Sequence, residues 1–209
     1  MNRFLMCPPD YFGIEYEINP WMRLNNQSDP VRAREQWQEL HRVLTEELGA
    51  GVELLEPAPG LPDLVFTANA GYVQGDLFVS SSFKHPQRQG ETPFFEAWFQ
   101  SHGYRIAKLE PGCIFEGAGD ALALGETVLA GYRHRSEICS HQALGEIIGR
   151  RVLSLELVDP LFYHLDTCFC PLDGEAALYF PGAFDDYANR ALTESVPVLL
   201  AVDQSPARR

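Results

Sequence analysis

The chain has 209 residues, of which 45% are hydrophobic and 22% charged, enough for one well-packed domain. Its formal net charge of −13 disfavours nucleic acid and anionic membrane surfaces as partners, because both repel an acidic protein. No run of about 18 apolar residues occurs, so no membrane span is predicted. We expect a single domain over residues 1–209.

The N-terminus and the cysteines bear on the cellular compartment. In MNRFLMCPPDYFG the apolar stretch before the proline pair is too short for a signal peptide. Five cysteines, at positions 7, 113, 139, 168 and 170, are an odd and scattered set rather than a disulfide framework. These features predict a reducing cytoplasm.

The N-terminal segment predicts a strand, a helix and a second strand. The strand is FLMC, and Asp29-Pro30 opens the helix, which Gly49 ends. One face of this helix carries an apolar stripe of Ala33, Trp37, Leu40, Leu44 and Leu48. The closing strand is VELLEP.

Three similar segments follow, and each predicts a β-hairpin, a helix and a further strand. The hairpins are LVFTANAGYVQGDLFVSS, FEGAGDALALGETVLAGY and FYHLDTCFCPLDGEAALYF, with turn glycines at Gly75, Gly125 and Gly174. The helices are TPFFEAWFQSHG, with Thr92 as N-cap, then SEICSHQALGEIIG, ending at Gly149, and DDYANRALTES. The closing strands are RIAKLE, RVLSLEL and VPVLLAV. The chain thus contains three ββαβ units and one unit without its hairpin, a repeat typical of units arranged around an axis or along a solenoid.

The unusual polar residues gather on the first predicted strand of each hairpin. They are Asp63 and Asn69 in the first hairpin, Glu116 and Asp120 in the second, and His164 and Asp166 in the third. Around a common axis these groups would meet near one end. A cluster of buried carboxylates with one histidine implies a cationic guest, because uncompensated buried charge is costly. A wholly structural alternative treats the same groups as solvated strand ends.

Arginines occupy a second equivalent position, Arg88 in HPQRQGE and Arg135 in YRHRSE. Their planar guanidinium groups suit a carboxylate, so acids and arginines together fit a zwitterionic ligand with a cationic tail. Each arginine alone also fits a surface ion pair.

The run from 162 to 172 raises the question of a metal site. Read as a strand, it places His164, Asp166, Cys168 and Cys170 on one face. Neighbours on one strand face stand roughly 6.6 Å apart and do not converge on one ion. We therefore predict no metal, and interpret the two cysteines as small buried hydrophobic residues.

The segments DLVFTANA, FEGAGDAL and HLDTCFCPL, in this order and spacing, resemble the pentein guanidino-group-modifying enzymes. That family includes arginine deiminases, dimethylarginine hydrolases and amidinotransferases. The opening FLMCPPDYFGIEYEINPWM is especially similar to arginine dihydrolases. The resemblance covers the chain to about Val202 and implies an α/β propeller of ββαβ units around a pseudo-fivefold axis, here with its last unit incomplete.

The resemblance also implies roles for individual residues. In the family a cysteine thiolate attacks the guanidinium carbon, and a histidine protonates the leaving amine and activates water. His164 resembles that histidine and Glu116 the carboxylate that orients it, while Asp166 would hold the guanidinium group. The substrate-binding set implied by the resemblance, with no metal and no organic cofactor, is Asn19, Asp63, Phe66, Asn69, Arg88, Asp120, Arg135 and Asp166. Asn69 and Asn19 favour the dihydrolase branch, which converts arginine to ornithine, ammonia and carbon dioxide.

One part of the family pattern is missing. The family nucleophile is a cysteine near the C-terminus in a glycine-rich stretch, and LLAVDQSPARR contains none. Cys7, Cys113 and Cys139 could in principle substitute, but neither Cys113 nor Cys139 has a glycine-rich loop or a helix N-terminus to lower its thiol pKa. Two interpretations follow: part of a guanidine hydrolase that is inactive alone, or a non-catalytic guanidine-binding protein or domain that a partner chain completes. An incomplete propeller would also leave an open sheet edge, through which copies of the chain could associate.

Overall fold

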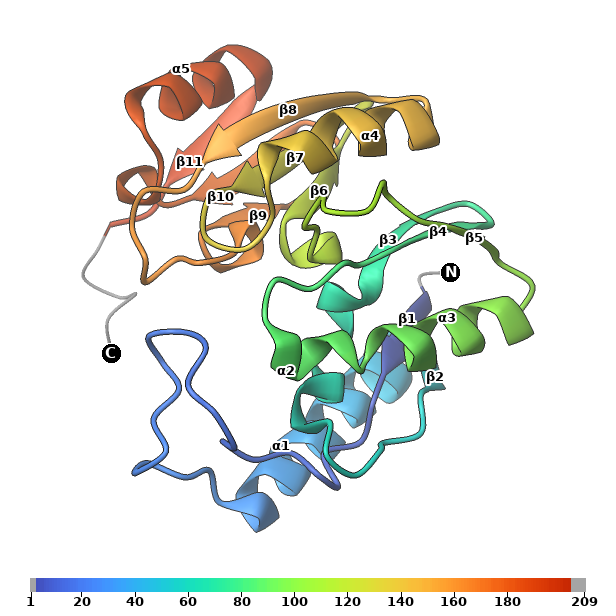
Figure 1. Ribbon diagram of the computed structural model, residues 1–209. Coiled ribbons are helices and arrows are strands. Elements are labelled where there is room, and N and C mark those ends of the chain that lie inside the picture. Colours follow the sequence, from blue (N-terminus) through green and yellow to red (C-terminus); the bar gives the residue numbers. More distant parts are fainter. Residues whose placement is uncertain (1–2, 204–209) are drawn as a thin grey trace.

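The computed structural model describes residues 3–203 as a series of α/β units (Figure 1). Three units share one order of elements: a β-hairpin, then a helix, then a strand. The first is β3 (Gly71–Gln74), β4 (Leu77–Ser80), α2 (Pro86–Gln89), α3 (Thr92–Ser101) and β5 (Arg105–Ala107). The second is β6 (Ala121–Leu124), β7 (Thr127–Tyr132), α4 (Ile138–Ile148) and β8 (Arg151–Glu156). The third is β9 (Phe169–Pro171), β10 (Ala176–Tyr179), α5 (Asp186–Ser195) and β11 (Val198–Ala201).

Each of these units forms a three-stranded sheet whose middle strand is the second strand of the hairpin. The strand orders are β3-β4-β5, β6-β7-β8 and β11-β10-β9. The middle strand pairs antiparallel with the first strand and parallel with the last. Gly75 and Gly125 occupy the hairpin turns with φ of +60° and +53°, a conformation that favours glycine. The predicted repeat is confirmed.

The N-terminal unit is smaller. It consists of β1 (Arg3–Met6), α1 (Pro30–Arg42) and β2 (Gly51–Leu54). Strands β1 and β2 pair in parallel from Arg3–Gly51 to Met6–Leu54, so β1 takes the place of a middle strand. Within residues 3–203, β1 has no antiparallel partner on its other edge. The expectation of one unit without its hairpin is confirmed.

Helix boundaries follow local capping chemistry. The Asp29 side chain accepts hydrogen bonds from the N–H groups of Val31 and Arg32 at the start of α1. Gly149 ends α4 in the left-handed conformation with φ of +66°. The prediction of Thr92 as an N-cap is wrong, because α3 already includes Thr92. The Thr92 hydroxyl donates to the carbonyl of Ser81 at 3.3 Å.

The core lies between the helices and their sheets. Where α3 covers β4, the rings of Phe78 and Phe99 stack with centroids 3.8 Å apart. Leu144 of α4 and Leu192 of α5 are both fully buried. Helix α1 differs, because none of its residues is buried, and Leu40 of the predicted apolar stripe is 53% exposed. A two-stranded sheet offers α1 too little apolar surface to cover that stripe.

The first strand of each hairpin is shorter than predicted, and a 3₁₀ turn precedes it. These turns are Pro62–Val65 and Thr67–Ala70, Gly117–Gly119, and Leu165–Thr167. The polar residues predicted on the first strands therefore lie in or beside these turns. In the third unit the N–H of Thr167 bonds the carbonyl of His164, and Cys168 that of Leu165, which closes a turn where extended backbone was predicted.

The proposed shared strand face from His164 to Cys170 is consequently wrong. The strand begins only at Phe169. Cys168 is buried, as predicted, but Cys170 is exposed. No three histidine, cysteine or acidic side chains among residues 3–203 form a group able to hold a metal ion. No helix in this described range is both long and apolar enough to cross a membrane.

Candidate active site

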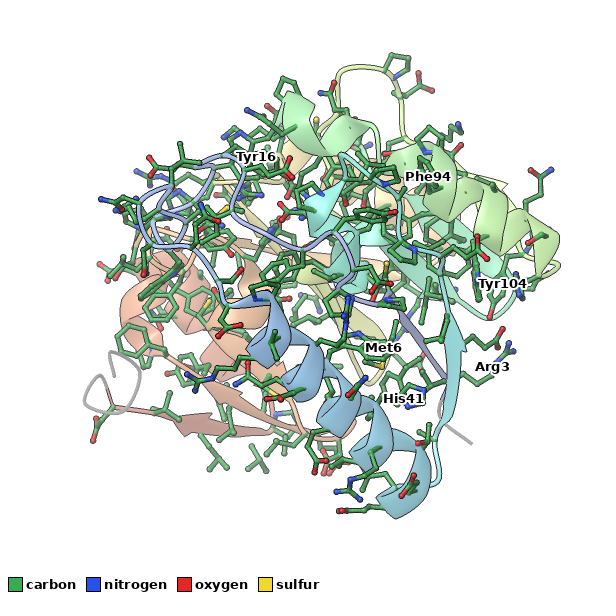
Figure 2. The ribbon with its side chains drawn as sticks, turned by 90° about the horizontal axis from the view of Figure 1, so that it is seen from below. Arg3, Met6, Tyr16, His41, Phe94 and Tyr104 are labelled. Atoms are coloured by element: carbon green, nitrogen blue, oxygen red, sulfur yellow. The ribbon has the colours of Figure 1, made fainter. Side chains whose placement is uncertain are left out.

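Side chains from the turns of the first and third units, from α2, from the loop after β7 and from the long loop between β1 and α1 line one cavity of about 350 Å³. Figure 2 labels Tyr16 in this loop. The cavity is lined by Phe12, Ile14, Ile18, Asn19, Trp21, Met22, Asp63, Phe66, Asn69, Arg88, Arg135, Tyr163, His164, Asp166 and Thr167. The structure thus brings eight of the ten predicted site residues to one cavity. The other two, Glu116 and Asp120, lie behind His164.

Glycines allow the turns to approach one another. A Cβ atom on Gly119 would lie 2.2 Å from Asn69 Nδ2 and 3.3 Å from His164 Nδ1. Gly117 has φ of +62°, and a Cβ there would lie 2.6 Å from the backbone nitrogen of Gly71. The segment FEGAGDAL therefore needs both of its glycines, because the site residues of neighbouring units could not otherwise converge.

His164 lies between two buried carboxylates. Its Nε2 is 3.3 Å from Glu116 Oε2, and its Nδ1 is 3.2 Å from Asp120 Oδ2. Burial acts to lower the pKa of His164, but the two carboxylates outweigh it and raise the pKa to about 9. The imidazole is consequently a cation at neutral pH, and its role as the proton donor to a substrate stays a prediction.

Glu116 is fully buried and held by fixed donors. Its Oε2 accepts a hydrogen bond of 2.9 Å from Arg135, and its Oε1 accepts the backbone N–H of Lys84 at 3.1 Å. Burial acts to raise the pKa of Glu116, yet His164 and Arg135 lower it to about 2. Glu116 is therefore ionised across the neutral range, and its role in orienting the imidazole for catalysis stays a prediction.

Asp120 receives three hydrogen bonds, two of them from one residue that the sequence did not reveal. The N–H and hydroxyl of Ser136 both donate to Oδ2, at 3.1 and 2.6 Å. The N–H of Leu165 donates to Oδ1 at 3.1 Å. Asp120 thus links the second unit to the turn that carries His164.

Arg88 is buried and paired with Glu91, another residue that was not predicted. Its Nε and Nη2 each donate to the Glu91 carboxylate at 2.8 Å. Its Nη1 donates to Asn69 Oδ1 at 3.0 Å, which directs the amide nitrogen of Asn69 toward His164 Nε2 at 3.5 Å. Glu91 could have been suspected from its spacing of three residues from Arg88. The role of Arg88 in binding a substrate carboxylate stays a prediction.

The loop between β1 and α1 is tied to the site by side-chain contacts. Asn19 Oδ1 accepts the N–H groups of Trp21 and Met22 at 2.9 and 3.1 Å. Arg135 donates to the carbonyl of Ile18 at 3.0 Å and its guanidinium carbon lies 4.8 Å from the Tyr163 ring centre. Asn19 therefore shapes the loop, and its contact with a substrate stays a prediction.

Two further carboxylates, those of Asp63 and Asp166, line the cavity. Asp63 is 2% exposed, and its Oδ1 has no hydrogen-bond partner among residues 3–203. Burial raises the pKa of Asp63 against the attraction of Arg88, whose Nε is 3.8 Å from Oδ2. Asp166 lines the cavity and is exposed to it, and partial desolvation by the cavity walls raises its pKa to about 6. A cationic guest would compensate both groups.

The thiols lie elsewhere. The cavity lining contains no cysteine among the described residues, which include all five. Burial raises the pKa of Cys7 to about 12, and a hydrogen bond with Cys113 and burial raise that of Cys139 to about 11. None of these surroundings favours a thiolate.

Known proteins place this arrangement in a family. The chain is 41% identical over 206 residues to the N(G),N(G)-dimethylarginine dimethylaminohydrolase of Mycobacterium tuberculosis, covering 99% of this chain and 67% of that protein. The chain belongs to this family of guanidine-modifying enzymes. It is also 53% identical over 193 residues to the bifunctional arginine dihydrolase/ornithine cyclodeaminase AgrE of Nostoc, covering 91% of this chain but only 27% of AgrE. No family model matches the chain.

Solved structures agree with this assignment to the guanidine-modifying family. The N-terminal domain of the cyanobacterial arginine dihydrolase ArgZ superposes with a TM-score of 0.94 at 48% identity, covering 98% of this chain and 77% of that one. The dimethylarginine hydrolase of Pseudomonas aeruginosa superposes with a TM-score of 0.79 at 18% identity, a likeness of fold alone. The pentein-type α/β fold of ββαβ units is confirmed.

Proposed function

We propose that the chain forms the guanidine-binding and proton-transfer part of an arginine-hydrolysing site. The observation that carries this is the cavity lined by the carboxylates of Asp63, whose Oδ1 accepts no hydrogen bond from residues 3–203, and Asp166, beside the charged His164. A guanidinium group supplies the positive charge and the planar set of N–H donors that two carboxylates accept. The proposed ligand is arginine.

Relatives support arginine as the ligand. Cysteine-substituted variants have been crystallised with L-arginine in AgrE and with substrate in the N-terminal domain of ArgZ. An asparagine-to-serine variant of ArgZ is covalently bonded to a reaction intermediate. These observations were made on AgrE and ArgZ themselves. Both proteins are much longer than this chain, which covers 27% of AgrE and 28% of ArgZ.

The chemistry divides between binding and attack. Asp166 and Asp63 would hold the guanidinium group, and the His164 imidazolium would give its proton to the departing ammonia. The neutral imidazole would then accept a proton from water, with Glu116 and Asp120 stabilising each return to the cation. Arginine and two waters would yield ornithine, two ammonia and carbon dioxide. The covalent step needs a thiolate, and no thiol of this chain lines the cavity, so we expect the chain alone to be inactive.

We also propose that the protein resides in a reducing cytoplasm, because its five cysteines are free.

Calorimetry with arginine tests the binding step. We expect binding to the purified chain, a loss of at least tenfold in affinity in Asp166→Asn, and no change in Asp76→Asn, whose carboxylate is exposed and paired with Arg105. A folded wild-type chain that binds no arginine would overturn the proposal. Agmatine and dimethylarginine, tested alongside, separate the possible guanidines.

Product analysis tests the chemical step. We expect no ammonia from arginine incubated with the chain. Ornithine with two ammonia per arginine would overturn the expected inactivity and show an unrecognised nucleophile on the dihydrolase branch. Citrulline with one ammonia would place the chain on the deiminase branch instead.

A second candidate is a non-catalytic guanidine-binding protein, or a domain that a partner chain completes. Completion by a partner chain is favoured because one edge of β1 has no strand partner within residues 3–203, and Phe4 of this strand is 43% exposed. Light scattering after size exclusion separates these possibilities. A stable monomer of about 23.5 kDa that binds arginine supports a binding protein that functions alone. A dimer that Phe4→Lys dissociates supports association through this edge.

A further inference from the structure

Ser136 connects the two carboxylates that flank His164. The residue is fully buried and follows Arg135 directly. Its hydroxyl donates to Asp120 Oδ2 at 2.6 Å and accepts the backbone N–H of Glu116 at 2.9 Å. The Ser136 hydroxyl oxygen therefore holds the side chain of Asp120, which faces His164 Nδ1. It also holds the backbone of Glu116, whose side chain faces His164 Nε2.

The backbone around Ser136 is built to present these groups. Its carbonyl accepts the N–H of Arg133, and Arg133 has φ of +103°, the only positive φ of a non-glycine residue among residues 3–203. Such a conformation costs of order 1–3 kcal/mol and persists only where the surroundings impose it. The strained turn aims both the N–H and the hydroxyl of Ser136 at one oxygen of Asp120.

That oxygen is the one that faces the histidine. Asp120 Oδ2 lies 3.2 Å from His164 Nδ1, while Oδ1 is taken by the N–H of Leu165. Without the hydroxyl, Oδ2 would keep a single donor and the buried N–H of Glu116 would lose its partner. The carboxylate could then rotate away from the imidazole, and its attraction for the imidazolium would fall with distance.

We propose that Ser136 is a positioning residue that holds Asp120 against His164 and so sets how firmly the imidazole keeps its proton. Ser136 does not line the cavity and acts only through Asp120 and Glu116. The meaning of this role for catalysis rests on the proposed function, but the proton affinity of His164 is measurable without it.

The other charged groups around His164 stay unchanged when Ser136 is replaced. Glu116 faces Nε2, with Arg135 beyond it. Asp166 and Asp120 interact electrostatically with the same imidazole, and Arg88 lies behind Asn69. A shift on substitution of Ser136 therefore reports on the geometry of Asp120 and Glu116.

The experiment is an NMR titration of the histidine side-chain nitrogens in the ¹⁵N-labelled chain, with His164→Gln to assign the resonance. We expect Ser136→Ala to lower the pKa of His164 by about one unit, the size of one hydrogen bond to a charged group. The matched control is Ser140→Ala, because Ser140 is equally buried but its hydroxyl donates to the carbonyl of Glu137. The control should leave the pKa of His164 unchanged.

A second variant guards against misfolding. Ser136→Cys keeps a donor on the same Cβ atom but donates more weakly, so it should lower the pKa of His164 by a smaller amount. An unchanged or raised pKa in a folded Ser136 variant, or an equal shift in Ser140→Ala, would overturn the proposal. If the shift appears in a chain that binds no arginine, only the proposed function fails. If arginine binds and no shift appears, only this inference fails.

Discussion

The N-terminal unit and the unit of β6, β7, α4 and β8 contain related elements but differ in burial. In the second of these, the middle strand β7 has partners on both edges, and Leu129 in it is 1% exposed. In the N-terminal unit β1 has one partner, and α1 contains no buried residue. A helix stripe of apolar residues is therefore buried only where a complete sheet lies under it.

Polar contacts differ in the same way. The Glu116–Arg135 pair joins the β6–β8 unit to the site and is almost fully buried. The Glu39–Arg42 pair on α1 has side chains that are 61% and 40% exposed. A buried pair is costly to break because the remaining charge stays out of water, whereas solvent screens an exposed pair. Four expected outcomes sharpen this contrast.

The largest effect is expected from breaking the buried pair. Glu116→Gln leaves Arg135 and the charged His164 without their shared carboxylate, and should lower the free energy of unfolding by about 3–5 kcal/mol. The matched change Glu39→Gln should cause no measurable loss. Urea unfolding followed by circular dichroism measures both. Similar losses in the two variants would show that burial does not separate the two regions.

Truncation of apolar side chains comes next. Leu129→Ala should lower the free energy of unfolding by about 2–5 kcal/mol, because it opens a cavity in a closed core. Leu40→Ala on α1, where the side chain is 53% exposed, should lower it by less than about 1 kcal/mol. A comparable loss at Leu40 would mean that α1 is covered in solution, which would favour association through the N-terminal unit.

The dependence of stability on pH should come from the central unit. His164 has a pKa raised from 6.5 to about 9, so its stabilising contribution is complete below pH 6.5 and is lost as pH rises through 9. Glu116 has a pKa lowered from 4.5 to about 2, so its contribution is complete above pH 4.5 and is lost as pH falls through 2. Between about pH 6.5 and 9.5 the free energy of unfolding should fall by up to about 3 kcal/mol more in the wild type than in His164→Gln. Parallel pH profiles of the two proteins would contradict the raised pKa of His164.

The smallest effect concerns helix capping. Asp185 accepts the N–H of Ala188 at 2.7 Å at the start of α5, whose Ala188 and Leu192 are fully buried. Asp185→Ala should therefore lower global stability by about 1 kcal/mol. Asp29→Ala removes an equivalent cap from α1, where fraying should appear as faster amide hydrogen exchange in α1 alone. An equal loss of global stability in both variants, or faster exchange over the whole chain in Asp29→Ala, would contradict this distinction.

The repeat and the convergence of polar residues were both predictable from sequence. Glycine turns, helix ends and alternating apolar residues report on local structure, and three aligned units fixed which segments are equivalent. The 3₁₀ turns around Asn69, Glu116 and Asp166 were not predicted, because a period of two over so few residues does not distinguish a strand from a turn. Ser136 was missed because a lone serine carries no signal until the fold places it beside Asp120. The exposure of Leu40 was missed because the helix pattern does not tell whether a sheet is complete.

The contacts around His164 also bear on how the chain folds. Asn69 and His164 are 95 residues apart in sequence, and Asp120 and Leu165 are 45 apart. Each hairpin and its helix can form from neighbouring residues, but these contacts require three units to have docked, and loops of this length close at an entropic cost. The cluster of His164, Glu116 and Asp120 should therefore become ordered late in refolding, after the backbone of each unit that contributes a side chain has folded.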